Sequence, residues 1–213
     1  MREELYKWKY LALASKVAKE MQKRRFEVHI VETKDELVDK IKGLIPQGSS
    51  VATGGSLTLT ETGILDLLRS GDYVFFDRNS AKTPEERREL ELKAFNVDFY
   101  LASANAITED GKLVFLDGNG NRVAAITYGP KNVLIVASVN KVVKDIEEAR
   151  ERLRFISPMN SKRLNLETPC TKTGYCSDCT APQRICNYFV VVESSARLPE
   201  RIKVILTTFD CGL

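Results

Sequence analysis

Residues 52–63 read ATGGSLTLTETG, and they stand where a predicted strand passes into a predicted helix. Gly54 and Gly55 let the backbone turn tightly there. The amide groups at the start of the helix, together with the hydroxyls of Ser56 and Thr58, predict a binding site for a phosphate or a carboxylate. A Gly-Gly-Ser sequence can also be a plain turn. A strand-to-helix junction of this kind favours an α/β fold, in which ligands bind at the carboxyl ends of the strands.

The segments around this junction alternate between helix and strand. Thr33 and Glu36 form a capping box, and Thr83, Pro84 and Glu86 combine an N-cap, a proline at the first helical position and a capping-box glutamate. The predicted order is helix 4–25, strand 26–31, helix 33–45, strand 50–53, helix 58–69, strand 73–76 and helix 83–95. This alternation predicts an α/β fold with three layers, in which a mainly parallel sheet is flanked by helices.

The second half of the chain has a different pattern, in which short polar turns separate strand-like runs. These runs are 98–108, 112–116, 122–128 and 132–139. Turns rich in Asn, Asp and Gly are typical of antiparallel hairpins. We therefore expect an antiparallel hairpin insertion from Asp110 to Gly129, with residues 117–121 as its turn. A helix at 142–155 and strands at 188–193 and 202–209 follow.

The predicted hairpin carries alternating apolar residues. Leu113, Phe115, Val123 and Ala125 are expected to face a common surface, against the sheet or against a second subunit. An exposed hairpin needs to be covered, so the sequence predicts a homodimer as one arrangement.

At 213 residues the chain is long enough to bury a proper core. We expect one α/β domain at 1–160, a cysteine-rich segment at 161–187, and closing strands at 188–213 that belong to the same domain.

The net charge of +3 is too small to indicate nucleic acid. No apolar run approaches the about 18 residues that a membrane span needs, and residues 1–10 are charged. The chain is therefore expected to be cytoplasmic, without membrane or nucleic-acid partners.

Four of the five cysteines fall in one segment, spaced C-x5-C-x2-C-x6-C. Thiolates bind zinc and iron–sulphur clusters, and the turn from Cys176 to Cys179 can bind one centre that Cys170 and Cys186 close. The spacing matches neither the ferredoxin run nor the zinc ribbon, so it does not name the metal. Disulfides and plain structural thiols are the alternatives, although a reducing cytosol favours metal or redox chemistry. Cys211 is expected to lie outside the centre.

Other candidate site residues follow predicted strands. Asn140 and Lys141 come directly after a buried strand, where a cation can meet an anionic ligand, although a lysine there is often simply exposed. We expect Asn105, Asn140 and Lys141 to share one pocket with residues 54–58. Glu61 is the candidate general base, and it could equally cap the helix or lie in solvent. The single histidine, His29, lies on a predicted strand of alternating character and is expected to face the core or solvent, so no Ser-His-Asp triad is predicted.

Several of these motifs, taken together, resemble the LUD (lactate utilisation) domain family. The matching stretches are GGSLTL with Glu61 and Gly63 at 54–63, ANAITEDG at 104–111, DGNGNRVAA at 117–125, GPK at 129–131 and VNK at 139–141. Linked motifs in one order are far more specific than any one of them. The resemblance runs from about the first helix to Cys186. It implies a fold similar to that of ribose-5-phosphate isomerases and CoA transferases.

The resemblance also implies a function. LUD proteins are associated with the oxidation of lactate to pyruvate, in which they act with iron–sulphur partner proteins, and short members often carry a cysteine-rich tail. An iron–sulphur cluster is therefore expected ahead of zinc. The expected role is an accessory protein or subunit in iron–sulphur-dependent oxidation of lactate or a related organic acid. The alternatives are an independent enzyme acting on a phosphosugar or CoA-type anion, and a redox-sensing module. Whether the chain is itself an enzyme is left open.

Overall fold

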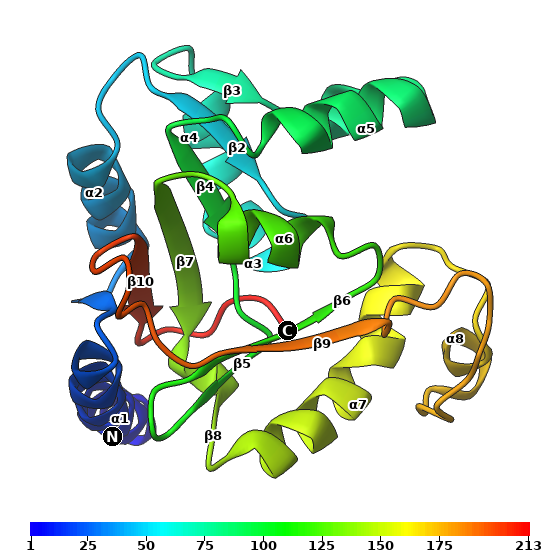
Figure 1. Ribbon diagram of the computed structural model, residues 1–213. Helices are drawn as coiled ribbons and strands as arrows, with labels where there is room; N and C mark the ends of the chain where they lie inside the picture. The colour runs from blue at the N-terminus through cyan, green and yellow to red at the C-terminus, as the bar shows by residue number, and fades with distance from the viewer.

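The computed structural model describes residues 1–213 and contains two sheets (Figure 1). In the larger sheet all neighbouring strands are parallel, in the order β1-β10-β7-β4-β2-β3. Its strands are β1 (Glu27–Val31), β2 (Ser50–Thr53), β3 (Val74–Phe76), β4 (Phe99–Ala102), β7 (Asn132–Ser138) and β10 (Ile202–Thr207). The smaller sheet has the order β8-β5-β6-β9, formed by β5 (Ala106–Thr108), β6 (Leu113–Asp117), β8 (Val142–Val143) and β9 (Tyr188–Val192). The predicted α/β fold with a mainly parallel sheet is confirmed.

Helices cover both faces of the larger sheet. They are α1 (Arg2–Lys23), α2 (Lys34–Leu44), α3 (Leu57–Glu61), α4 (Ile64–Arg69), α5 (Pro84–Lys93), α6 (Asn121–Tyr128), α7 (Ile146–Arg163) and α8 (Pro169–Thr173), with 3₁₀ turns η1 (Arg78–Ser80) and η2 (Val139–Lys141). Two predicted caps are present, because Thr33 Oγ1 accepts from Glu36 N and Thr83 Oγ1 accepts from Glu86 N, both at 3.1 Å. Each such cap stabilises its helix by about 1 kcal/mol.

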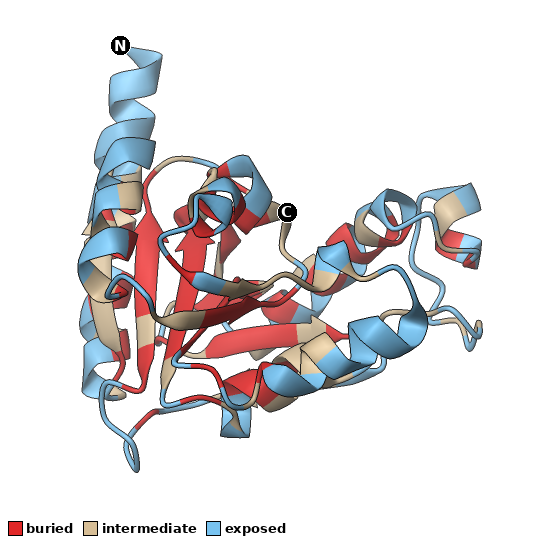
Figure 2. Ribbon diagram, turned by 90° about the horizontal axis from the view of Figure 1, so that it is seen from above, coloured by how far each residue is buried: buried red, intermediate tan, exposed pale blue.

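The core consists of apolar layers on either side of the larger sheet. Helices α2, α3 and α4 pack on one face, while α1, α6 and the smaller sheet pack on the other. Helix α7 covers the outer face of the smaller sheet. Every residue of β7 from Val133 to Ser138 is buried, as expected for a central parallel strand. Figure 2 shows the buried strands inside the molecule, and the first half of α1 extends from its body.

The predicted hairpin from Asp110 to Gly129 is wrong. The run 122–128 is helix α6, and the true hairpin joins β5 to β6 through the turn after Thr108. Residues 117–121 begin a helix because Asp117 Oδ1 accepts from Gly120 N at 3.2 Å and its Oδ2 accepts from Val123 N at 3.3 Å. The four apolar residues expected to share a surface do so, but that surface is the core: Leu113, Phe115, Val123 and Ala125 are all buried in it. They therefore offer no surface to a second subunit.

Other element boundaries also differ from the prediction. The run 98–108 divides into β4 and β5, which belong to different sheets, because the chain leaves the larger sheet at Ser103. The helix predicted at 58–69 is broken into α3 and α4 at Gly63, whose φ of 75° is incompatible with a continuous helix. The helix predicted at 142–155 begins only at Ile146, after the N-cap Asp145, and continues to Arg163. The cysteine-rich loop contains the short helix α8.

The closing strands join two different sheets. Strand β9 pairs antiparallel with β6, and β10 inserts between β1 and β7 in the larger sheet. Arg201, which precedes β10, is buried and donates to the carbonyls of Pro130, Ile126 and Ala125. It therefore fixes the end of α6 to the larger sheet. None of the helices combines the length and the apolar character that crossing a membrane requires.

Candidate functional site

A cleft of about 620 Å³ lies at the carboxyl ends of three neighbouring strands of the larger sheet. The chain leaves β2 at Gly54, β4 at Ser103, and β7 through η2 at Lys141, and all three residues line the cleft. Parallel strands end at the same edge of a sheet, so the strand order brings these distant segments together. The end of α7 and the loop at 182–187 supply the opposite wall.

Most of the predicted ligand-binding residues lie in this cleft. Its walls include Gly54, Gly55, Ser56, Thr58, Asn105 and Lys141. The hydroxyl of Ser56 caps α3, since its Oγ accepts from Leu59 N at 3.2 Å. Asn140 does not line the cleft, and its side-chain oxygen is buried without a hydrogen-bond partner.

Glu61, the candidate general base, lies outside the wall of the cleft. Its Oε2 accepts from Gly212 N at 2.7 Å, so the carboxylate holds the segment around Gly212 against α3. Gly212 has a φ of 69°, and a Cβ there would lie 2.1 Å from Thr58 Oγ1. Only glycine fits this close approach. The position of Glu61 favours a structural role.

Lys141 is 2% exposed and forms the floor of the cleft. Its Nζ donates to Thr58 Oγ1 at 2.8 Å, to Ser103 Oγ at 3.0 Å and to the carbonyl of Ala104 at 3.4 Å. Burial lowers the pKa of Lys141 from its ordinary 10.5 to about 8, because a buried ammonium loses its hydration. A buried lysine with such a pKa, in a cleft, is typical of a functional site.

Arg122 organises the part of the cleft next to Lys141. Its Nη2 donates to Asn105 Oδ1 at 2.9 Å and to the carbonyl of Leu116 at 2.7 Å, and its Nε pairs with Asp117 Oδ2 at 3.2 Å. A Cβ at Gly54 would lie 3.1 Å from Cγ and Cδ of Arg122, so Gly54 leaves room for the aliphatic part of that side chain. The double glycine thus serves close packing as well as the turn.

The charge of the cleft is strongly positive. Its six cationic residues are Arg78, Arg87, Arg122, Lys141, Arg163 and Arg184, and its one acidic residue is Asp117. Arg78 and Arg87 both pair with Glu91, and Arg184 pairs with Asp178 at 3.4 Å. Lys141 and Arg163 have no carboxylate partner, and Arg163 donates only to Asn160 Oδ1. Such a cleft attracts and binds anions.

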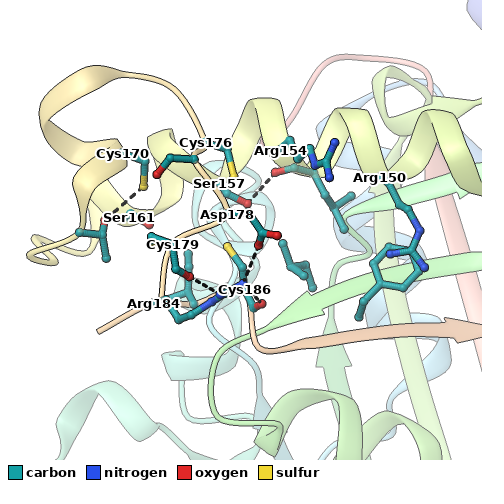
Figure 3. Close-up of a pocket in the computed structure, with 16 residues that line it drawn as sticks. Arg150, Arg154, Ser157, Ser161, Cys170, Cys176, Asp178, Cys179, Arg184 and Cys186 are labelled. Atoms are coloured by element: carbon teal, nitrogen blue, oxygen red, sulfur yellow. Dashed lines mark hydrogen bonds and ion pairs between the residues drawn. The ribbon is translucent and has the colours of Figure 1, made fainter. Parts of the chain in front are cut away.

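The four clustered cysteines line a second pocket, of about 210 Å³, between α7 and the loop that follows α8 (Figure 3). Cys170 is buried, with its Sγ 3.1 Å from Thr168 Oγ1, whereas Cys176 is exposed. Burial raises the pKa of the Cys186 thiol. Cys211 lies elsewhere, buried beside Thr207.

All five thiols are free, and no three His, Cys, Asp or Glu side chains come close enough together to hold a metal ion. Four thiols around one pocket are nevertheless a donor set that suits an iron–sulphur cluster or zinc. The residues therefore fit such a centre by their chemistry, and the loop would have to draw the sulphur atoms together to bind it.

The cysteine pocket and the cleft share a wall. Leu116, Arg184 and Ile185 line both. The guanidinium of Arg184 donates to the carbonyl of Cys179 and, at 2.9 Å, to the carbonyl of Cys186 (Figure 3). One arginine thus fixes the cysteine-rich loop and faces the cleft.

The sequence does not predict the arginines of the cleft or Ser103. Arg122 lies in a run that the sequence predicts to be a strand, and nothing near Arg163 or Arg184 in the sequence indicates that they line the same cleft as Lys141. Ser103 follows β4, which ends at Ala102, whereas the sequence predicts one strand-like run as far as Thr108. Among the cations of the cleft that the sequence does not predict, only Arg78 comes closely after a predicted strand, at 73–76.

The fold and the site together define a class: an α/β protein with a cation-lined cleft at the carboxyl ends of its parallel strands. The family model of the LUD domain matches residues 14–207, and the chain belongs to this family. No protein with a curated function matches the sequence.

Among solved structures, the chain is similar to a DUF162 family protein from Deinococcus radiodurans, with 13% identity and a TM-score of 0.52 over 94% of this chain and 98% of the other. This similarity shows the fold. Ribose 5-phosphate isomerase from Plasmodium falciparum aligns with 19% identity and a TM-score of 0.34 over 52% of each chain. The eIF2B delta subunit from Chaetomium thermophilum aligns with 16% identity and a TM-score of 0.36, over 53% of this chain and 48% of the other.

Proposed function

We propose that this LUD protein is an accessory protein or subunit in the oxidation of lactate or a related organic acid, and that it acts with iron–sulphur partner proteins. In this proposal the cleft binds the anionic acid, and the neighbouring cysteine pocket holds an iron–sulphur cluster. The observation that carries the proposal is the wall of Leu116, Arg184 and Ile185 that the cleft and the pocket share.

The charges of the cleft support the binding of a carboxylate. Lys141 and Arg163 lack carboxylate partners, so an incoming anion does not have to displace one from them. Hydrogen bonds between a cationic donor and a carboxylate contribute about 1.5–3 kcal/mol each. Arginine also binds a carboxylate with two parallel N–H donors, which fixes the orientation of the acid.

The cysteine pocket supports the redox part of the proposal. Cys170, Cys176, Cys179 and Cys186 would hold the cluster, which supplies electron transfer when it is bound. Zinc at the same four thiols would be structural and would not transfer electrons. Arg184 holds the loop in place through the carbonyls of Cys179 and Cys186, so the loop and the cleft are positioned by one side chain.

The metal part is tested on protein purified without oxygen, by iron, sulphide and zinc analysis with a visible absorption spectrum. Wild type and Cys211→Ser, which alters the cysteine outside the pocket, should contain iron and sulphide and show a broad visible band. Cys176→Ser should lose both. Protein without iron, or equal iron in all three forms, contradicts the cluster.

The anion part is tested by the thermal shift that lactate and pyruvate produce. Arg163→Met should weaken binding about ten-fold, since one charge-assisted hydrogen bond contributes about 1.5 kcal/mol or more. Arg88→Met is the matched control, because Arg88 is exposed on α5 and does not line the cleft. Equal thermal shifts in Arg163→Met and Arg88→Met would mean that the acid binds outside the cleft.

The size of the cleft favours a second candidate, an independent enzyme acting on a phosphosugar or a CoA-type anion. A volume of about 620 Å³ exceeds what lactate fills, and it falls in the range of about 300–1,000 Å³ typical of sites for larger ligands. Ribose 5-phosphate and acetyl-CoA in the same thermal-shift experiment distinguish the two. Stronger stabilisation by either of them than by lactate and pyruvate, together with turnover, would support this candidate instead.

A further inference from the structure

Lys141 is the only lysine in the cleft, and no carboxylate lies within ion-pair distance of its nitrogen. The partly buried Arg122 and Arg78, in contrast, pair with Asp117 and Glu91. Around Nζ are two hydroxyls and one backbone carbonyl. No ion pair therefore holds this lysine in its charged form.

The hydrogen bonds around Nζ can persist when the ammonium loses a proton. Each hydroxyl, of Thr58 and of Ser103, can donate or accept. One of them can therefore turn and donate to the neutral amine, while the other hydroxyl and the carbonyl of Ala104 accept from it. The two hydroxyl oxygens are also 3.2 Å apart, which links them into one chain.

Charged and titratable groups act on Lys141 from several elements. Burial has the largest effect and lowers its pKa to about 8, with Arg152 and Arg122 acting in the same direction and Cys211 and Glu61 opposing them. About a tenth of the side chain is then a neutral amine at pH 7 and about half at pH 8. An unprotonated lysine amine is a nucleophile for carbonyl groups.

We infer that Lys141 forms an imine with a 2-oxo acid bound in the cleft. The inference rests on the proposed function, because a 2-oxo acid is what oxidation of a 2-hydroxy acid produces. The carboxylate of the acid binds the remaining cations of the cleft, and its carbonyl carbon lies against the amine on the floor. Lys141 is thereby a covalent binding residue as well as a positive charge.

The step balances without an oxidant or a reductant. The lone pair of neutral Nζ forms a bond to the carbonyl carbon, and the bond from that carbon to oxygen breaks. The oxygen leaves as water, which carries the two hydrogens of the amine, and a C=N bond is left. Hydrolysis reverses the step and releases the 2-oxo acid unchanged.

The experiment traps this imine in the full-length wild-type protein. Pyruvate and cyanoborohydride are added, and digestion with peptide mass spectrometry locates lysines that carry the reduced adduct. The adduct should concentrate on Lys141, increase several-fold between pH 6.5 and pH 8, and disappear in Lys141→Met. Lys144→Met is the matched control, because Lys144 is exposed nearby and should leave the yield unchanged.

The outcomes separate this inference from the proposed function. A pyruvate thermal shift without an adduct on Lys141 overturns the imine and leaves anion binding in place. No shift and no adduct overturns both. An adduct spread evenly over exposed lysines also overturns the imine. If Lys141→Met does not fold, the peptide map of the wild type decides alone.

Discussion

The substitution Lys141→Met removes a buried charge whose pKa differs between the folded and unfolded chain. The folded value is about 8 against an ordinary value of 10.5, so the unfolded chain binds the proton more tightly. When the pH lies between these two pKa values, the unfolded state binds more protons than the folded state. The stability of the wild type therefore rises with pH in this range. Burying Lys141 therefore costs no electrostatic stability above about pH 10.5, where the amine is neutral in both states. This stability is lost as the pH falls from 10.5 through about 8, because the buried amine must then carry a charge. Each pKa unit is worth about 1.4 kcal/mol, so the full change over the shift from 10.5 to about 8 is about 3–4 kcal/mol.

About 2 kcal/mol of this change should appear between pH 7 and pH 9.5. The assay is urea unfolding of wild type, Lys141→Met and Lys144→Met, followed by circular dichroism across this range. The unfolding free energy of the wild type should rise relative to Lys141→Met, while Lys144→Met follows the wild type. A constant difference between wild type and Lys141→Met would refute the lowered pKa of Lys141, and with it the reason to expect a nucleophilic amine at neutral pH.

Three further substitutions test other parts of the structure. Gly54→Ala should lower stability by about 1–3 kcal/mol in urea unfolding and weaken pyruvate binding, because the new Cβ would lie 3.0 Å from Tyr100 Oη. If the variant is as stable as the wild type and binds pyruvate equally well, the loop can shift to accommodate the Cβ and this reasoning is wrong. Arg201→Met leaves three carbonyls without their buried donor, and it should lower stability by about 2–4 kcal/mol; an unchanged melting temperature would contradict this. Cys179→Ser should release metal but leave the far-ultraviolet circular dichroism intact, and a general loss of structure would show that the cysteine-rich loop supports the core.

The first half of the fold follows from local signals. Thr33 and Thr83 cap their helices as predicted, because a capping side chain bonds to backbone only three residues away. The second half does not, because a turn sequence such as residues 117–121 can start a helix as readily as a hairpin. The choice depends on Asp117, whose carboxylate accepts from Val123 N in the first turn of α6 and also pairs with Arg122. Arg122 in turn donates to Asn105 Oδ1 and to the carbonyl of Ser103, which are 17 and 19 residues away in the sequence, and such tertiary partners are not visible in local spacing.

The candidate site was only partly predictable for the same reason. Gly54, Thr58, Asn105 and Lys141 each follow a strand, and the rule that parallel strands end at one edge brings them together. Arg163 and Arg184 come from a helix end and a loop, whose direction in space depends on the packing of α7. The sequence placed Lys141 near an anion, but its burial, and hence its lowered pKa, appears only in the folded structure.

The shared wall between cleft and cysteine pocket is tested most directly by the visible spectrum of anaerobically purified protein, recorded while lactate is added. Because Arg184 lines both spaces and bonds to the loop that carries the cysteines, lactate in the cleft should perturb the absorption of the cluster, and Arg163→Met should shift this response to higher lactate concentration. A spectrum that does not change at lactate concentrations that stabilise the protein would contradict the account.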